Sequence, residues 1–224
     1  MGTTVGVVVF PGTNCEFDVV EAIGEVGGEA TLLWHGDTDV GAVDAVVVPG
    51  GFAHGDYLRP GAIARFSPMM EAVTQFANDG GPVVGICNGF QVLTEAGLLP
   101  GALQKNAGLK FKSGQCTLVS GNSWSSFTTG VEVGTQLAIP INHFEGNYTC
   151  DADTLAELQD NDRIVFRYAD NPNGSMADIA GICNAAGNVV GMMPHPERAC
   201  NPLLGSTDGQ PSFRSLLATA GATV

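Results

Sequence analysis

Three short runs made almost entirely of apolar residues place the strongest constraint on the fold of this chain. They cover residues 5–10, 44–48 and 82–86. None of them alternates polar with apolar side chains, and a strand of that kind is typical of a sheet covered on both faces. Parallel sheets meet this condition because their crossover helices cover them. The sequence therefore predicts a parallel sheet with helices on both sides.

Segments of helical periodicity lie between these runs and support the same fold class. Residues 14–27 and 67–80 carry apolar side chains at helical spacing and end in glycine pairs. Ser67 followed by Pro68 is typical of a helix N-terminus. Such alternation of strands and helices predicts an α/β fold with an open, mostly parallel sheet. A further strand and a further helix are expected over residues 30–34 and 88–97.

The pattern changes after residue 101, where strand-like segments follow one another closely. A polar turn at residues 184–188 predicts a hairpin, and residues 211–220 predict a closing helix. We expect an antiparallel portion beside or on the parallel sheet, within a single domain spanning residues 1–224. The strand-like segments cover residues 115–120, 136–141, 163–168, 178–183 and 189–193.

Charge and composition exclude several kinds of partner and site. The chain has 23 acidic and 9 basic residues and a net charge of −14, which argues against binding to nucleic acids or anionic membranes. No apolar run reaches the roughly 18 residues that a membrane helix needs. Without a recognisable signal peptide, we expect a cytoplasmic protein whose six cysteines are reduced. No cysteine pair has zinc-ligand spacing, so no metal site is expected.

Residues 85–89, with the sequence Gly-Ile-Cys-Asn-Gly, form the sharpest motif of the chain. They fit the G-x-nucleophile-x-G turn between a buried strand and a helix, with Cys87 as the nucleophile. The two glycines leave room for the tight turn, and the helix N-terminus favours a thiolate. Taken alone, the motif also fits a buried core cysteine beside two turn glycines.

A histidine between two prolines follows the last apolar run. His195 and Glu197 are two residues apart in a segment whose backbone Pro194 and Pro196 restrain. In an extended segment their side chains share one side, so that the carboxylate orients the imidazole. Together with Cys87 they predict the nucleophile, base and orienting residue of a covalent mechanism.

Two loops are expected at the same edge of the sheet as the cysteine. Residues 49–53 contain Gly50 and Gly51, where a backbone N–H can contribute to an oxyanion hole together with the amide of Asn88. Residues 11–14 end the first strand and fit an anion site or a pocket wall. Either segment is also compatible with an ordinary turn.

His143 and Glu145 form a second histidine–glutamate pair with the same spacing. This pair is a possible rival to His195 and Glu197, although no second nucleophile turn accompanies it. A loop that contacts the substrate or a partner is the favoured interpretation. The chain has neither a G-x-x-x-x-G-K-[ST] phosphate loop nor a G-x-G-x-x-G motif after a strand, so no nucleotide site is expected.

These motifs together resemble the class I, or triad-type, glutamine amidotransferases. Residues 85–91 and 194–198 carry the features of the whole class. Residues 10–16 and 55–61 are similar to one branch, the small glutaminase subunits of a purine-biosynthetic synthetase. Where that branch usually has His-Gly-Glu-Gly, Phe144 replaces the first glycine here. The resemblance covers nearly the whole chain and implies the flavodoxin-like sheet of that class.

The resemblance also implies roles for individual residues. Cys87 attacks the carboxamide carbon of glutamine, His195 transfers the proton to the leaving ammonia and Glu197 holds His195. The oxyanion and substrate residues implied are Gly51, Phe52, Asn88 and Gln91. No cofactor is implied for this chain.

The partners implied are a large synthetase subunit and a small third subunit. The synthetase uses ATP and Mg²⁺, with the ammonia, to convert formylglycinamide ribonucleotide to formylglycinamidine ribonucleotide. The alternatives are a glutaminase subunit of another synthetase, a stand-alone cysteine hydrolase of related fold and an inactive binding module. The second usually has a histidine directly after the nucleophile, where this chain has Asn88, and the intact Cys87, His195 and Glu197 set weighs against the third.

All three lysines of the chain fall within eight residues, at Lys105, Lys110 and Lys112. A basic cluster on an otherwise acidic surface gives electrostatic complementarity to one partner. We predict that this cluster faces the synthetase subunit. The alternative is a solvated surface loop, which is what most charge runs are.

Overall fold

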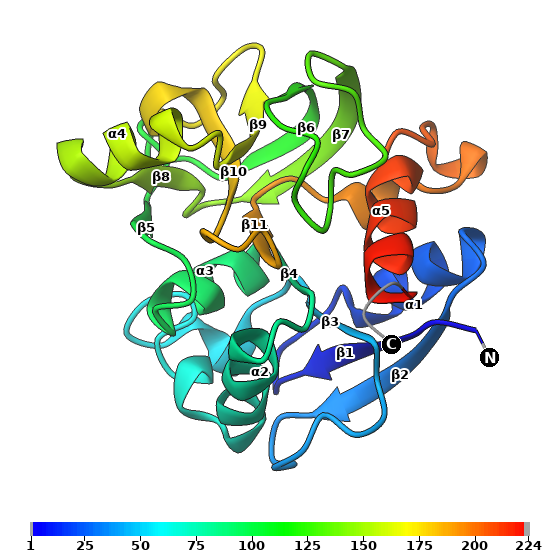
Figure 1. Cartoon of the computed structure of the whole chain (residues 1–224). Coiled ribbons are helices and arrows are strands. Elements are labelled where there is room, and N and C mark those ends of the chain that lie inside the picture. Colours follow the sequence, from blue (N-terminus) through cyan, green and yellow to red (C-terminus); the bar gives the residue numbers. More distant parts are fainter. Residues whose placement is uncertain (1, 222–224) are drawn as a thin grey trace.

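The computed structural model describes residues 2–221, and one nine-stranded sheet forms its centre (Figure 1). The strand order is β2-β1-β3-β4-β11-β10-β9-β6-β7. The first five strands of that order run parallel to one another. This was predicted for four of them, while residues 189–193 were expected in the antiparallel portion and instead pair parallel with β4 as β11. Their bounds are β2 Glu29–Trp34, β1 Thr4–Val9, β3 Ala45–Val48, β4 Val83–Ile86 and β11 Val189–Met192.

The antiparallel portion continues this sheet and forms no separate layer. The hairpin predicted at residues 184–188 joins β10 to β11, and the remaining strands pair antiparallel beyond it. The expectation of an antiparallel portion beside the parallel one is therefore confirmed. The bounds are β10 Ile179–Cys183, β9 Ile164–Tyr168, β6 Lys112–Ser120 and β7 Gln136–His143.

Helices cover both faces of the parallel portion, as expected for strands without a polar face. In Figure 1, α2 and α3 lie on one side of β4 and β11, and α1 and α5 lie on the other. The Ser67 hydroxyl accepts a hydrogen bond from the amide of Met70 and caps α2, as predicted. The helices are α1 Glu16–Glu25, α2 Pro68–Asn78, α3 Asn88–Glu95 and α5 Gln210–Gly221.

Three elements were not predicted from the sequence. The strands β5 (Ala102–Gln104) and β8 (Asn147–Thr149) form a separate two-stranded antiparallel sheet. Three residues are too few to show a period of two. The helix α4 (Ala152–Asp160) buries only Leu158 fully, so its apolar stripe is weak. Its N-terminus depends on Asp151, whose carboxylate accepts from the amide of Thr154 at 2.7 Å.

The register between β4 and β11 brings the two catalytic motifs to one edge of the sheet. Ile86 pairs with Met192, and the amide of the following Cys87 donates to the Met192 carbonyl at 2.7 Å. The segments after β4 and β11 then leave the sheet side by side, so residues 87 and 193–195 emerge at the same carboxyl edge. Ligands bind at this edge in open α/β sheets. Among the helices of residues 2–221, none has the length and apolarity to cross a membrane.

Candidate active site

Cys87 occupies the strained turn between β4 and α3. Its φ of 52° and ψ of −106° are unusual for a residue with a side chain. Such a conformation costs about 1–3 kcal/mol and is typical of functional sites. The flanking glycines explain how the turn fits. A Cβ on Gly85 would lie 2.7 Å from the carbonyl carbon of Gly89, and a Cβ on Gly89 would overlap the Val48 carbonyl.

The sulfur of Cys87 lies in a pocket beside the first turn of α3. The residue is 6% exposed, and its sulfur lies 3.8 Å from the carbonyl oxygen of Asn142. The unpaired amides and the positive end of the helix dipole at this turn stabilise negative charge. The helix N-terminus expected beside the nucleophile is therefore present, although the sulfur is more enclosed than an outward-pointing side chain.

His195 and Glu197 form a buried hydrogen-bonded pair. The imidazole Nδ1 lies 2.6 Å from Glu197 Oε1, and the two residues are 1% and 2% exposed. The amide of His195 donates to the Pro140 carbonyl at 2.8 Å, and Glu197 lies in the short turn Pro196–Ala199. Nδ1 faces the Glu197 carboxylate, so Nε2 is the ring nitrogen that gains and loses the proton. That atom has no hydrogen-bond partner among the described residues, so it is available as a base.

The surroundings of His195 make it a stronger base than free histidine. Burial alone would lower the pKa of the imidazole. The Glu197 carboxylate and the nearby cysteine sulfurs outweigh that effect and hold the pKa well above its usual value. A base of this strength can take the proton of a thiol and return it to a leaving group.

Gly50 lies where the side chains of the site converge. A Cβ at this position would be 2.9 Å from Cε1 of His195, 3.1 Å from the sulfur of Cys15 and 3.5 Å from Cβ of Cys87. The first two contacts are shorter than ordinary packing allows. The missing side chain therefore permits the histidine and the nucleophilic cysteine to approach each other.

The loop after β3, where an oxyanion hole is predicted, lies next to the turn at Cys87. Gly51 has a φ of 140°, and a Cβ there would lie 2.7 Å from the amide nitrogen of Asn14, so only glycine fits without strain. The Asn88 side chain ties the loop to α3 by accepting from the amide of Ala53 at 3.0 Å. Among the described residues, neither Gly51 nor Asn88 uses its own amide in a hydrogen bond.

The other two residues implied by resemblance line the pocket but have polar groups that are already engaged. The amide of Phe52 donates to the Gly12 carbonyl at 2.9 Å, so only its half-exposed ring faces the site. The carboxamide of Gln91 donates to the Glu145 carbonyl at 2.6 Å and accepts from Asn88 at 2.9 Å. Gln91 therefore forms part of a fixed polar wall.

The pocket around these groups is narrow, with a volume of about 50 Å³. That is room for about one or two water molecules, since one water occupies about 30 Å³ in the liquid. The predicted pocket wall at residues 11–14 contributes Asn14. The full lining consists of Asn14, Cys15, Gly51, Phe52, Asp56, Cys87, Gln91, Phe111, Asn142, His143, Phe144, Glu145 and His195.

The rival pair is not a pair in the structure. The Nδ1 of His143 lies 3.1 Å from Oδ1 of Asn106, not against the Glu145 carboxylate. Burial, and then the positive charge of His195, lower the pKa of His143 to about 4. His143 is therefore a neutral pocket residue at physiological pH, and the geometry favours His195 as the base.

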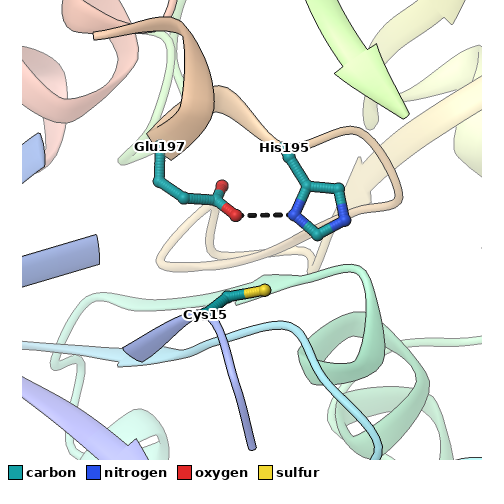
Figure 2. A group of neighbouring side chains, drawn as sticks. All are labelled: Cys15, His195 and Glu197. Carbon is teal, nitrogen blue, oxygen red and sulfur yellow. Dashed lines mark hydrogen bonds and ion pairs between the residues drawn. The ribbon is translucent and has the colours of Figure 1, made fainter. Parts of the chain in front are cut away.

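Cys15 is a second cysteine in the site, and no sequence motif assigned it a role. Figure 2 shows its side chain pointing toward the His195–Glu197 pair from the opposite side. The guanidinium of Arg198 donates to this sulfur at 3.1 Å and to Asp18 at 3.0 Å, which ties α1 to the Pro196–Ala199 turn. The signs of it in the sequence were the expected position of residues 11–14 at this edge and the resemblance carried by residues 10–16.

The donor atoms of Cys15, His195 and Glu197 lie within 4.8 Å of one another. They could therefore hold a metal ion, and residues 2–221 contain no other group of this kind with three or more members. The direct hydrogen bond between His195 and Glu197 already supplies what a triad needs. The absence of a metal site remains a prediction.

Comparisons with known proteins show the family of this chain. A family model described as a CobB/CobQ-like glutamine amidotransferase domain matches residues 3–211. A relative from Koribacter versatilis, the phosphoribosylformylglycinamidine synthase subunit PurQ, is 55% identical over 222 residues, which cover 95% of this chain and 96% of the relative. The protein of the same name from Rubrobacter xylanophilus is 53% identical over 216 residues, covering 96% of this chain and 98% of that relative.

Solved structures agree. A chain of the PurLQS structure from Thermotoga maritima superposes with a TM-score of 0.91 at 39% identity, covering 98% of this chain and 99% of that one. A putative GMP synthase subunit from Thermoplasma acidophilum has a TM-score of 0.69 at 15% identity, over 100% of this chain and 96% of that chain, and so shares the fold alone. This chain belongs to the glutamine amidotransferase family, within its branch of phosphoribosylformylglycinamidine synthase PurQ subunits.

Proposed function

We propose that this chain hydrolyses glutamine at Cys87 and supplies the ammonia to a synthetase subunit. The chain is a PurQ-type glutaminase subunit of phosphoribosylformylglycinamidine synthase and acts in purine biosynthesis. One observation carries the assignment of its site: the strained Cys87 emerges beside a histidine whose Nδ1 is held by Glu197 at 2.6 Å.

The geometry supports a thioester mechanism. His195 Nε2 takes the proton of Cys87, and the sulfur attacks the carboxamide carbon of glutamine. The amides of Gly51 and Asn88 hold the negative oxygen of the tetrahedral intermediate. The C–N bond then breaks, and His195 returns the proton to the nitrogen, which leaves as ammonia.

Water completes the cycle. His195 removes a proton from the water, which attacks the γ-glutamyl thioester at Cys87. The C–S bond breaks, glutamate leaves and the thiol recovers its proton from His195. Glu197 keeps the Nε2 lone pair directed at the reacting atoms in both halves of the reaction.

The chain works in a complex with a synthetase subunit. We further propose that the complex includes a small third subunit, and that the synthetase uses ATP and Mg²⁺ to convert formylglycinamide ribonucleotide to formylglycinamidine ribonucleotide with this ammonia. This chain needs no cofactor for the hydrolysis that we propose. Its six cysteines, all within the described residues, are free, which supports a reducing compartment such as the cytoplasm.

We also propose that the synthetase docks over the mouth of the pocket. Lys105 and Lys110 are exposed there, and Lys105 Nζ lies 6.0 Å from the ring centroid of Phe144 in the pocket wall. Two apolar side chains of the pocket lining, Phe52 and Phe111, are 49% and 48% exposed. Tyr57, Leu58 and Leu109, which are 68% to 89% exposed, lie within two residues of the lining residues Asp56 and Phe111 along the chain.

A glutaminase assay of the purified chain, with and without the synthetase subunit, tests the proposal. We expect weak hydrolysis by the chain alone, because the pocket is narrow, and strong stimulation by the synthetase. Cys87→Ser should abolish hydrolysis in both settings. Hydrolysis that survives Cys87→Ser would contradict the assignment.

A further inference from the structure

The pocket is lined by two carboxylates and by no basic side chain apart from its histidines. The carboxylates are Asp56 and Glu145. His143 is neutral because its pKa is about 4, and His195 is engaged by Glu197. A ligand with a positive group therefore meets unbalanced negative charge on this side of the pocket.

Asp56 is held in place by a strained loop. His54, Asp56 and Leu58 have φ values of 53°, 53° and 70°, a conformation that side chains seldom adopt. Such strain persists only where the surroundings impose it and is concentrated at functional sites. Here the amide of His54 donates to the Pro11 carbonyl at 2.6 Å, and the amide of Ala53 donates to Asn88, so the loop is fixed to the edge of the sheet.

One oxygen of Asp56 is used within the pocket wall, and the other is free. Oδ1 accepts from Nδ2 of Asn88 at 3.1 Å, and the same Nδ2 donates to Gln91 at 2.9 Å. Both hydrogens of that amide are thereby used. Within residues 2–221 no hydrogen bond reaches Oδ2 of Asp56, and the residue is partly exposed in the pocket. Oδ2 is therefore available to a ligand.

Apart from its histidines, the pocket lining holds no basic side chain that could compensate the charge of Asp56. Burial raises the pKa of Asp56 to about 6, the hydrogen bond from Asn88 opposes this effect, and the negative charge of Glu145 adds to it. Lys105 acts on Glu145, but Lys105 does not line the pocket. A cation beside Asp56 would relieve the cost of its charge.

We propose that Asp56 binds the α-ammonium group of glutamine through its free Oδ2 and selects amides that carry a free α-ammonium. The proposal rests on the glutaminase function proposed above and names a specificity-determining residue of that site. Oδ1 keeps its hydrogen bond to the side chain of Asn88, and the backbone amide of Asn88 is the proposed donor to the oxyanion. The residue that recognises the substrate is thus one hydrogen bond away from the residue that stabilises the oxyanion.

The test compares two substrates of the same length in the complex with the synthetase subunit. Glutamine carries the α-ammonium, and 4-carbamoylbutanoate has the same carboxamide and carboxylate without it. A hydrogen bond between charged groups corresponds to about a 10- to 150-fold preference. We expect the wild-type complex to prefer glutamine by such a factor in kcat/KM. Asp56→Asn should lower kcat/KM for glutamine by about 10- to 100-fold, mainly through KM, and change that for 4-carbamoylbutanoate less than about threefold.

Controls separate this role from damage to the oxyanion site. Asp79→Asn removes a carboxylate at the end of α2 that bonds only Gln75, and both substrates should react as with wild type. The rate of Cys87 alkylation by iodoacetamide should be the same in Asp56→Asn and wild type. An equal loss for both substrates would overturn the proposal in favour of a structural role, and an unchanged preference for glutamine would also overturn it.

The pH dependence of the preference gives a second readout. Below pH about 6 Asp56 takes up a proton and loses its attraction for the ammonium, so the preference for glutamine should fall more in the wild type than in Asp56→Asn. Cys15, Cys87, His143 and His195 act on both substrates and cancel in the ratio. Glu145 also faces the ammonium, but it is present in both forms, so the difference between wild type and Asp56→Asn reports on Asp56. Failure of the proposed function itself would appear differently, as hydrolysis of neither substrate by the wild-type complex.

Discussion

At the scale of single residues, the reaction depends on which ring nitrogen of His195 exchanges the proton. The hydrogen bond that Glu197 makes to the other nitrogen decides this. Glu197 accepts from Nδ1 of His195 and so makes Nε2 the nitrogen that exchanges the proton. Glu197 is 2% exposed, so water cannot replace its carboxylate as the hydrogen-bond partner of Nδ1. A neutral replacement allows the wrong tautomer, and a removed imidazole leaves no base.

We expect His195→Ala to lower kcat for glutamine hydrolysis by at least about 10³-fold, and Glu197→Gln by a smaller factor of about 10²-fold, with little change in KM. Steady-state assays of the complex measure both. Ammonia-dependent synthesis should be unaffected, because free ammonia bypasses the site. If Glu197→Gln were silent while Glu145→Gln stopped hydrolysis, the catalytic pair would be the one at residues 143 and 145.

At the scale of elements, strands and their helices were predictable, while contacts between distant segments were not. The apolar runs fixed β1, β3 and β4 because buried strands need no alternation, and Ser67 marked the start of α2 correctly. The short β5 and β8 have no recognisable period. The contact between Cys15 and Arg198 joins residues 183 positions apart, which no local pattern encodes.

The turn after β3 gives a prediction with a matched control. Gly50→Ala should place a methyl group 2.9 Å from His195 and 3.1 Å from Cys15, so hydrolysis should fall by at least about 10²-fold. Gly24→Ala lies in α1 with no atom within 4 Å of the new Cβ. It should leave activity unchanged and stabilise the fold by about 0.5–1 kcal/mol. Kinetics and thermal unfolding check both, and full activity in Gly50→Ala would contradict the convergence described for the site.

At the scale of the whole molecule, the acidic surface and the single basic cluster set how the chain meets its partner. Both features were visible in the sequence, as was the implied need for a synthetase. The position of the cluster at the mouth of the pocket was not, since Lys105 reaches it through its contact with Phe144. The single-domain organisation over residues 1–224 stays a prediction.

Reversing the charges of Lys105, Lys110 and Lys112 to glutamate should slow assembly with the synthetase subunit by at least about tenfold at low salt. Stopped-flow or surface-based association rates measure this. Arg214→Glu on α5 is the control and should change the rate little. Iodoacetamide should still modify Cys87 at the wild-type rate. Equal association rates for the triple variant and wild type would show that the cluster is only a solvated surface.

The assignment of Cys87 as the nucleophile is the central claim, and Cys15 beside the same histidine makes it testable. A glutamine analogue with an electrophilic diazoketone in place of the carboxamide should alkylate the attacking sulfur. Peptide mass spectrometry of the labelled complex should find one adduct, on Cys87, with glutamine protecting against it. Labelling should be lost in Cys87→Ser and retained in Cys15→Ser. An adduct on Cys15 in the wild-type complex, or labelling that survives Cys87→Ser, would contradict the account.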